Sequence, residues 1–440
     1  MLLLASLLFY SWGEPKALLV MIGLIAVNYY AALLMDTPKV NVVFSRRVLL
    51  WAAVILNLSA LFFYKYLDFA IININKLIPM FGMPEIELFH IALPIGISFY
   101  CFQAMSYTID VYRGEVEAQH SLARLALYIS LFPQLVAGPI VRYSTICSEL
   151  EDRTLHFDNV YEGLVRFSIG LAKKVFIADS MGFVADKIFV ANVSAIPQLW
   201  AWMGCIAYTL QIYYDFSAYS DMAIGLGRIF NFQFLENFNF PYSARSIKDF
   251  WRRWHISLSS WLRDYVYIPL GGNRISIVRT LVNQFIVFFL CGLWHGAAWN
   301  FVVWGIWHGL GLVSEKFTGR YLARLPALFA HAYVMLFVMT GWVFFRSPDL
   351  SYATAYLKIM FLGNAGYDMF SFIPAWRHCI TISNGFFMLL GLLFSWPIRI
   401  FSFHTLQHRY GGVLTLAVIF FVTYCFAMTS KFSPFLYFRF

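Results

Sequence analysis

The stretch CGLWHGAAWNFVVWGIWHG, residues 291–309, decides the fold class of this chain. It is apolar enough to lie in a bilayer, yet it contains His295, Asn300 and His308. A strongly polar or ionisable side chain at membrane depth costs roughly 2.5–3.5 kcal/mol on insertion scales. Lipid solubility does not explain three such residues in one segment. They indicate a reaction site or a permeation path inside the membrane.

The composition around this stretch is that of a membrane protein. Of 440 residues, 60% are hydrophobic and 12% are charged, whereas a soluble domain carries about 25% charged residues. A transmembrane helix needs roughly 20 apolar residues, so the apolar runs predict about ten to eleven spans. We expect one membrane-embedded domain, residues 1–440. The first run, residues 2–9, follows no basic segment and precedes no small-residue cleavage site, so we expect it to belong to the mature protein.

Charge and cysteine usage exclude several classes of protein. The net charge of +9 is spread through the loops and forms no single block, which argues against nucleic-acid binding and favours basic cytoplasmic loops. The six cysteines stand singly, so neither a disulfide framework nor a zinc site is predicted. Cys291, four residues before His295, permits a thiolate–imidazole acyl-enzyme. A packing role is favoured for it, because free cysteine is commonly a small packing residue.

Prolines and glycines interrupt several apolar runs, as at Pro94 with Gly96 and at Pro133 with Gly138. Broken helices at membrane depth are tolerated only where protein or water satisfies the freed backbone groups. These interruptions predict an irregular protein core rather than a bundle of straight rods.

A polar segment, residues 237–274, precedes the decisive stretch and contains DFWRRWHISLSSWLRDYVYIPLGGNR at residues 249–274. Its positive excess places its ends on the cytoplasmic side, and its aromatic residues suit the membrane interface or a re-entrant position. The charged residues are Arg245, Lys248, Arg252, Arg253, Arg263 and Arg274 against Asp249 and Asp264. The aromatic residues are Trp251, Trp254, Trp261, Tyr265 and Tyr267.

His295 is the first candidate for chemistry. Cys291 and Trp299 share its face if the helix is continuous. Histidine is the usual general base near neutral pH, and a buried imidazole stays neutral and able to accept a proton. A core histidine bonded to a backbone carbonyl of a neighbouring helix is the alternative.

Two further histidines are less decisive. His308 lies roughly 20 Å beyond His295 along a continuous helix, so both reach one reacting atom only if the helix breaks at Gly296. A structural or supporting role is favoured for His308. On a helix, His255 would have Arg252 at i−3 and Ser259 at i+4. It lies either in a cytoplasmic polar funnel or at the interface as a solvated histidine.

Asp215 and Asp221 stand among apolar residues and each needs a partner there. The partner candidates are Arg142, Arg228, Arg245 and Arg252. A structural ion pair and a proton relay both remain open. No GxSxG, Walker or HExxH motif occurs, which disfavours a serine hydrolase, a P-loop ATPase and a zinc protease.

Several long motifs, read together, resemble the membrane-bound O-acyltransferase (MBOAT) family, in its branch of bacterial alginate O-acetylation proteins. They cover nearly the whole chain: ALPIGISFYCFQAMSYTIDVYRG (92–114), LFPQLVAGPIVRY (131–143), YYDFSAYSDMAIGLGRIF (213–230), NFNFPYSARSIKDFWRRWHISLSSWLRDYVYIPLGGNR (237–274), GLWHGAAWNFVVWGIWHG (292–309) and FLYFRF (435–440).

This resemblance implies an all-α polytopic membrane protein, a ring of about ten to eleven tilted and broken helices with re-entrant segments around a thin core. It implies that an acetyl group moves from a cytoplasmic donor, acetyl-CoA or an acetylated carrier, to hydroxyls of an exported polysaccharide. Transfer is direct or passes through a partner protein. The family's active histidine falls on His295 and its second histidine on His255. The expected location is the bacterial inner membrane.

The site predicted on this basis has His295 as general base, with His255 as the second catalytic histidine. Oxyanion or tunnel candidates are Asn300, Trp304, Trp299 and His308, and donor-binding candidates are Arg245, Lys248, Arg252, Arg253 and Arg263. No metal or bound cofactor is expected. The expected partners are membrane lipid, the polysaccharide and a periplasmic or membrane-anchored acetyltransferase protein, without nucleic acid.

Two hypotheses without acyl transfer remain. A transporter or channel for the donor or the glycan fits the intramembrane histidines, although no repeat typical of many transporters is visible. A scaffold of an exopolysaccharide assembly would use FLYFRF, residues 435–440, as a docking strip.

Overall fold

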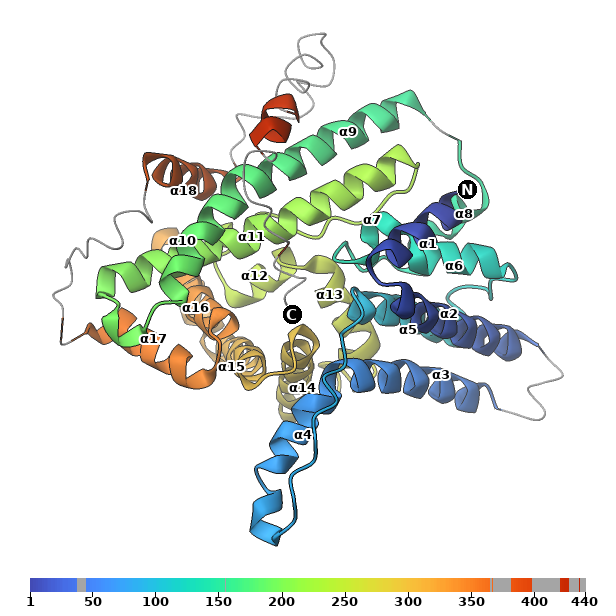
Figure 1. Cartoon of the computed structure of the whole chain (residues 1–440), viewed down its shortest axis with the longest axis horizontal. Helices are drawn as coiled ribbons and strands as arrows, with labels where there is room; N and C mark the ends of the chain where they lie inside the picture. Colours follow the sequence, from blue (N-terminus) through green and yellow to red (C-terminus); the bar gives the residue numbers. More distant parts are fainter. Residues whose placement is uncertain are drawn as a thin grey trace. The chain divides into compact units, whose positions relative to one another are not determined.

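The computed structural model describes residues 1–37, 45–154, 156–364, 366, 381–397, 420–426 and 435. Every regular element within these residues is a helix (Figure 1). The chain divides into two compact units, each made of segments that are not contiguous in sequence. Unit 1 is Met1–Gly163 with Ala223–Leu235, and unit 2 is Leu164–Met222 with Glu236–Phe440. That the whole chain forms one domain stays a prediction.

Unit 1 contains the N-terminal helices. A buried polar contact joins three of them: Thr108 on α5 donates to Asn28 on α2 at 2.7 Å, and the Asn28 amide meets that of Asn57 on α3 at 3.2 Å. The helices are α1 (Leu2–Gly13), α2 (Pro15–Asp36), α3 (Arg46–Leu61), α4 (Leu67–Asn75), α5 (Ile97–Arg113), α6 (Leu122–Ser130), α7 (Phe132–Leu135) and α8 (Tyr143–Glu151).

Unit 2 holds the decisive stretch and the polar segment before it. Two long helices, α9 (Phe157–Ala172) and α11 (Gln198–Ile229), run alongside each other and pass from one unit into the other (Figure 1). The remaining helices are α10 (Asp179–Phe189), α12 (Ile247–Arg253), α13 (Ile256–Leu262), α14 (Ile277–His295), α15 (Trp299–Leu322), α16 (Ala327–Arg346), α17 (Leu350–Leu362) and α18 (Ile382–Phe394). Two π-helical turns, η4 (Lys173–Ala178) and η7 (Arg263–Tyr267), interrupt the α-helices.

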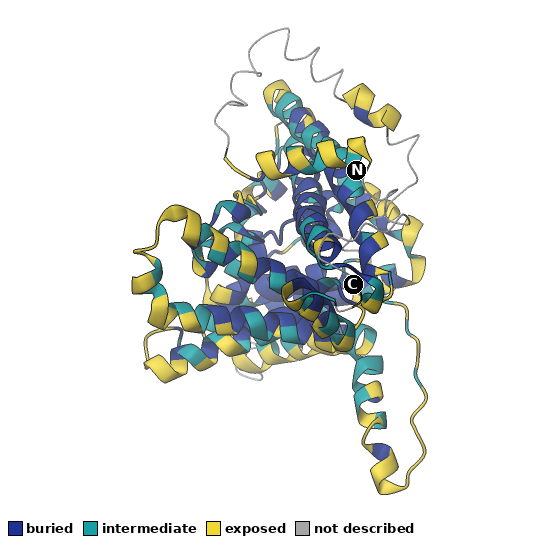
Figure 2. Cartoon of the chain, turned by 90° about the vertical axis from the view of Figure 1, so that its left-hand side faces the viewer, coloured by how far each residue is buried: buried dark blue, intermediate teal, exposed yellow. Residues whose placement is uncertain are grey.

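The distribution of apolar and polar side chains on the helices is that expected of helices that face lipid. On α14, Val278, Val282 and Phe285 form an exposed apolar face, whereas Asn283 and His295 lie on the buried face. Figure 2 shows exposed residues along one side of several helices and buried residues along the other side. In the described residues, α2, α14, α16 and the span Arg46–Asn75 are long and apolar enough to cross a membrane. The predicted all-α polytopic class is confirmed, while the ring and the count of spans stay predictions.

The predicted interruptions of the apolar runs are confirmed. Gly96 has a left-handed backbone (φ +75°) and directly precedes α5, where a Cβ would lie 2.6 Å from the Leu135 carbonyl oxygen. Only glycine fits that conformation and that approach. Pro133 lies in the first turn of the short helix α7, which ends before Gly138.

The decisive stretch forms a tight helical hairpin. Ser276 caps the start of α14 by accepting from the Arg279 amide, and α14 ends at His295 because Gly296 is extended. The two helices then approach through glycines. A Cβ on Gly292 would lie 2.4 Å from the Phe301 carbonyl oxygen, and one on Gly305 would lie 2.2 Å from that of Phe288. Small residues at such crossings let backbones pack closely in membranes.

Gly305→Ala is expected to lower the stability of the hairpin by about 1–3 kcal/mol, the usual cost of overpacking. The added methyl group meets backbone atoms, which cannot move aside as a flexible side chain can. Gly319→Ala on the same helix is the matched control, since a Cβ there meets nothing within 4 Å. Thermal unfolding in detergent should lower the Tm for Gly305→Ala alone; equal Tm values would contradict the packing.

The partners of the two buried aspartates differ from those predicted. Asp221 accepts from Arg166 at 2.8 Å and from Lys173 at 2.6 Å, and Asp215 accepts from Lys174 at 2.6 Å. The candidates Arg228, Arg245 and Arg252 were wrong. The π-helical turn η4 lets the consecutive residues Lys173 and Lys174 bond two aspartates that are six residues apart on α11. The spacing of an α-helix did not suggest this arrangement. The ion-pair interpretation is confirmed.

Candidate active site

His255 lies at a break between two short helices. α12 ends at Arg253 and α13 begins at Ile256, and His255 between them has a left-handed backbone (φ +44°). This conformation is uncommon outside glycine, although histidine is among the residues enriched in it. Two backbone hydrogen bonds hold the break. Asn239 donates to the Arg253 carbonyl, and Ile256 donates to the Asn237 carbonyl, both at 2.9 Å.

The side chain of His255 is fully buried, so the alternative of a solvated interfacial histidine is wrong. Its Nδ1 lies 3.1 Å from Oδ1 of Asn237. The same oxygen accepts from the backbone N–H of Ser257 at 3.2 Å and from its hydroxyl at 2.9 Å. On the far side of the amide, Nδ2 of Asn237 donates to Ser220 of α11 at 3.1 Å.

His295 is the last residue of α14 and is 4% exposed. Its ring centre lies 5.0 Å from that of Trp304 and 5.1 Å from that of Phe345, both edge-to-face. The ring of His255 lies 6.4 Å away. The fold therefore brings together, inside unit 2, the two histidines predicted to be catalytic.

His308 joins the same cluster from α15. The helix does break at Gly296, and Trp304 stands between the two histidines, with its ring centre 5.0 Å from each. Trp251 of α12 donates its indole N–H to Nδ1 of His308 at 3.1 Å. His308 is fully buried, and its Nε2 lies 3.0 Å from where a Cβ on Gly341 would stand. The hairpin thus places the ring of Trp304 between His308 and His295.

The other tunnel candidates occupy different positions. Asn300 is buried, and its amide donates to the Ser347 carbonyl at the end of α16 at 2.9 Å. Trp299 is 47% exposed and so lies outside the buried cluster. Trp304 is fully buried, and its indole N–H has no hydrogen-bond partner within the described part of the chain. A buried donor of this kind requires an explanation.

The basic candidates separate into two groups. Arg253 bonds Asp249 at 2.9 Å, and Arg263 bonds the neighbouring Asp264 at 2.6 Å, so both are neutralised locally. Arg245, Lys248 and Arg252 are exposed. Lys248 and Arg252 are four residues apart on α12 and share one face. Whether these three residues bind the acetyl donor stays a prediction.

Sequence reasoning missed the residues that enclose the histidines. Asn237 was not singled out, and neither were Trp342 and Phe345, which come from α16. Trp251 and Trp254, which we expected at the interface or in a re-entrant position, are buried in the protein. Their depth in the membrane stays a prediction. Within NFNFPY, residues 237–242, a polar residue amid aromatic ones was the available signal.

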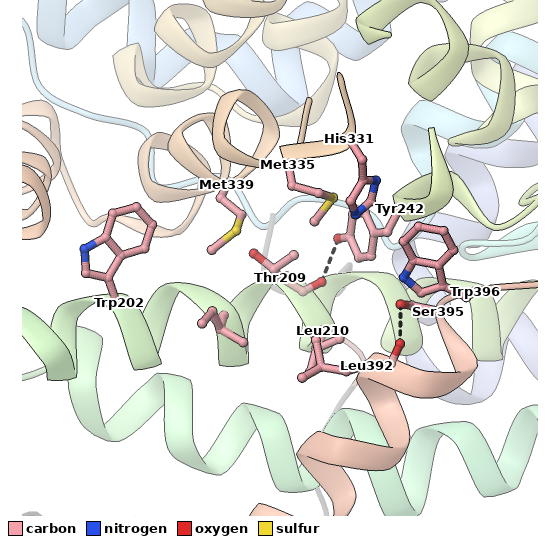
Figure 3. A pocket seen from close by; sticks show the side chains of 11 residues that line it. Trp202, Thr209, Leu210, Tyr242, His331, Met335, Met339, Leu392, Ser395 and Trp396 are labelled. Atoms are coloured by element: carbon pink, nitrogen blue, oxygen red, sulfur yellow. Dashed lines mark hydrogen bonds between the residues drawn. The ribbon is translucent and has the colours of Figure 1, made fainter. Parts of the chain in front are cut away.

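A separate cavity of about 360 Å³ lies between α11, α16 and α18 (Figure 3). Its lining is almost entirely apolar, with Trp202, Met335 and Met339 on its walls and His331 at one end. None of the predicted site residues lines it. Tyr242, in its wall, donates to the Thr209 carbonyl at 2.6 Å.

The cluster can support proton transfer, because its histidines are buried among aromatic side chains. Two buried imidazoles stand side by side, and the buried ring of Trp304 packs against one of them, His295. Buried polar groups among membrane helices mark functional sites by default. Fold and site together define a polytopic membrane protein with a cluster of buried histidines.

Comparisons with known proteins agree with this class. Residues 115–346, which include all three histidines of the cluster, match the membrane-bound O-acyltransferase family. The chain is 44% identical to the probable alginate O-acetylase AlgI of Pseudomonas aeruginosa over 362 residues, 82% of this chain and 69% of that protein. It is 38% identical to the peptidoglycan O-acetyltransferase of Helicobacter pylori over 390 residues, 82% of this chain and 73% of that protein.

A more distant relative is the teichoic acid D-alanyltransferase of Bacillus subtilis, which is 30% identical over 238 residues, 51% of this chain and 59% of that protein. The chain belongs to the membrane-bound O-acyltransferase family. It is an acyltransferase and a multi-pass membrane protein.

Proposed function

We propose that this enzyme moves an acetyl group from a cytoplasmic thioester to hydroxyls of an exported polysaccharide, directly or through a partner protein, in the bacterial inner membrane. The observation that carries the proposal is the burial of His295 beside His255, with ring centres 6.4 Å apart. The printed names of its relatives, an alginate O-acetylase and a peptidoglycan O-acetyltransferase, support an acetyl group and a glycan acceptor.

In this mechanism His295 is the general base. It takes the proton of an acceptor hydroxyl as the oxygen forms a bond to the thioester carbonyl carbon. Collapse of the tetrahedral intermediate breaks the carbon–sulfur bond, and the imidazolium returns the proton to the leaving thiolate. The products are an acetyl ester and a free thiol. His255 is the second catalytic histidine beside the same reacting atoms.

Trp304 is the best candidate for stabilising the oxyanion. Its ring centre is 5.0 Å from that of His295, and its indole N–H has no partner in the ranges that the structure describes. A preorganised donor in a water-excluded site stabilises developing negative charge strongly. Asn300 is less suited, because its amide already holds the end of α16.

The acetyl donor, acetyl-CoA or an acetylated carrier, docks at the exposed positive face of residues 245–252. The phosphates of CoA match the charges of Arg245, Lys248 and Arg252. None of the three forms a salt bridge within the described ranges, although the Glu315 carboxylate accepts from the Lys248 backbone N–H and lies near its charge. Attraction of this kind depends on ionic strength.

Reversing two of these charges, Lys248→Glu with Arg252→Glu, is expected to raise KM for acetyl-CoA about tenfold, the equivalent of about 1.4 kcal/mol. The value of kcat should change little, because these residues bind ground state and transition state equally. Lys316→Glu with Arg320→Glu is the matched control, an exposed basic pair at the same spacing on α15. Equal effects of the two pairs would contradict the docking site.

The experiment that tests the function is transfer of labelled acetyl from acetyl-CoA by purified protein in nanodiscs, with a soluble glycan acceptor. A nanodisc has no separate compartments, so a transporter or channel produces no acetylated glycan there. Labelled acetyl ester is the expected product. If only a mixture with a partner acetyltransferase protein gives ester, transfer through a partner is established. Labelled donor that stays intact under both conditions contradicts the proposal.

The scaffold hypothesis rests on the strip FLYFRF, of which residues 436–440 lie outside the described residues. Its first residue, Phe435, packs against the chain itself. The ring lies 5.1 Å from that of Tyr219 and 4.7 Å from the Lys174 ammonium. This residue therefore favours an internal packing role.

A further inference from the structure

The orientation of the buried Asn237 side chain follows from its partners. A backbone N–H only donates, so the atom that lies 3.2 Å from the Ser257 nitrogen is the amide oxygen. The opposite atom, Nδ2, then donates to the Ser220 hydroxyl at 3.1 Å. The amide is held from two sides, by α13 and by α11, and Asn237 itself is fully buried.

This orientation determines the proton of His255. An amide oxygen only accepts, and Oδ1 of Asn237 lies 3.1 Å from Nδ1 of His255. Nδ1 therefore carries the hydrogen. An imidazole that is fully buried among aromatic rings is neutral, because burial disfavours its charged form. A neutral ring has one hydrogen, so the lone pair is on Nε2, on the side of the ring away from Asn237.

His308 has the opposite tautomer in the same cluster. The indole N–H of Trp251 only donates, and it meets Nδ1 of His308 at 3.1 Å. The lone pair of His308 is therefore on Nδ1 and its hydrogen is on Nε2. The tautomer of each histidine therefore follows from one hydrogen-bond partner, Asn237 for His255 and Trp251 for His308.

We propose that Asn237 is a positioning residue that holds the hydrogen of His255 on Nδ1 and so gives His255 a proton-accepting Nε2. This inference rests on the proposed function, in which both histidines serve acyl transfer. Only a ring with its lone pair on Nε2 accepts a hydrogen bond or proton at that nitrogen. The backbone of Asn237 serves the same end, since its carbonyl accepts from Ile256 next to the left-handed His255.

The first test is nuclear magnetic resonance of ring-15N-labelled histidine in the full chain, reconstituted in lipid without substrate. The resonances of His255 and His308 are assigned by their loss in His255→Gln and His308→Gln. For His255 we expect a hydrogen on Nδ1 and none on Nε2. For His308 we expect a hydrogen on Nε2 and none on Nδ1. An Nδ1 without a hydrogen on His255 of the wild type overturns the proposal, independently of the results for the variants.

The second test changes the amide. Asn237→Leu should remove the single tautomer of His255, whereas Asn237→Asp keeps an acceptor and should retain it. Asn273→Leu, at an exposed asparagine outside the break at His255, should change nothing. The His308 signal reports folding, because Trp251 fixes it independently of Asn237. An unchanged His255 signal in a folded Asn237→Leu variant overturns the proposal.

The activity readout separates this proposal from the function itself. Acetyl transfer should fall by about 10²-fold or more in Asn237→Leu, the range that a positioned acid or base contributes, and should recover in part in Asn237→Asp. If the tautomers are as expected but the wild type transfers no acetyl group, alone or with a partner acetyltransferase protein, the function fails and the positioning role stands. If the wild type is active and Asn237→Leu matches it, the positioning role fails alone.

Discussion

Replacing His295 with alanine is expected to lower acetyl transfer by about 10²–10⁴-fold, the usual contribution of a positioned base. The ring lies at the end of α14 against Trp304, Phe345 and His255, with 4% of the residue exposed. Little solvent reaches this interior, so no buffer molecule replaces the lost imidazole. The measurement is the rate of labelled acetyl transfer in nanodiscs, with gel filtration as a check of folding.

Two control variants make this loss specific. His331→Gln changes a histidine of α16 that lines the separate cavity, and its activity should remain close to that of the wild type. Cys291→Ala removes the buried thiol one helical turn before His295 and should also remain active. Loss of transfer in Cys291→Ala, with an acetyl group trapped on the wild-type enzyme in intact-mass spectra, would instead establish an acyl-enzyme. Full activity of a folded His295→Ala variant would remove the assignment.

Asp221→Leu is expected to lower the free energy of unfolding by about 1–3 kcal/mol, between the cost for an exposed pair and that for a buried one, because Arg166 and Lys173 are 28% and 30% exposed. The Asp221 carboxylate is 13% exposed and accepts from Arg166 and Lys173. Arg166 keeps a second partner in Glu236, at 2.5 Å, but Lys173 loses the carboxylate that it bonds. Unfolding monitored by tryptophan fluorescence in detergent measures the change.

A double variant tests the physical cause of that loss. Lys173→Met with Asp221→Leu removes the charge together with its partner, and apolar replacements of a whole buried pair are often neutral. It should recover most of the stability that Asp221→Leu loses. Glu151→Gln, at an exposed pair with Arg124, should cost no more than about 1 kcal/mol. A double variant as unstable as the single one would show that the carboxylate serves some other purpose.

The features that the sequence predicted correctly are those that depend on local chemistry. Composition indicates a membrane protein, and glycine lies at two of the predicted interruptions, with Gly96 at the start of α5 and Gly296 at the end of α14. The convergence of His255 with His295 was reached by resemblance and not by spacing.

The features that the sequence did not predict depend on contacts between distant segments. A helical reading of RRWHISLSS placed Arg252 and Ser259 beside His255, but the segment that begins at Asn237 bonds both sides of the break and imposes a left-handed residue. The partners of Asp221 come from residues 166 and 173, about fifty positions earlier, through a π-helical turn. Neither arrangement has a periodic signature.

The left-handed backbone at His255 also limits how this position can change during evolution. With φ at +44°, β-branched and bulky side chains are strained there, whereas asparagine and aspartate tolerate the conformation. Of these, asparagine is uncharged, as a buried site requires, and it keeps a polar group at the same place. When histidine at position 255 is replaced during evolution, asparagine is therefore the first polar residue to be expected there. A related enzyme with asparagine at this position would keep the left-handed turn and lose the titratable ring.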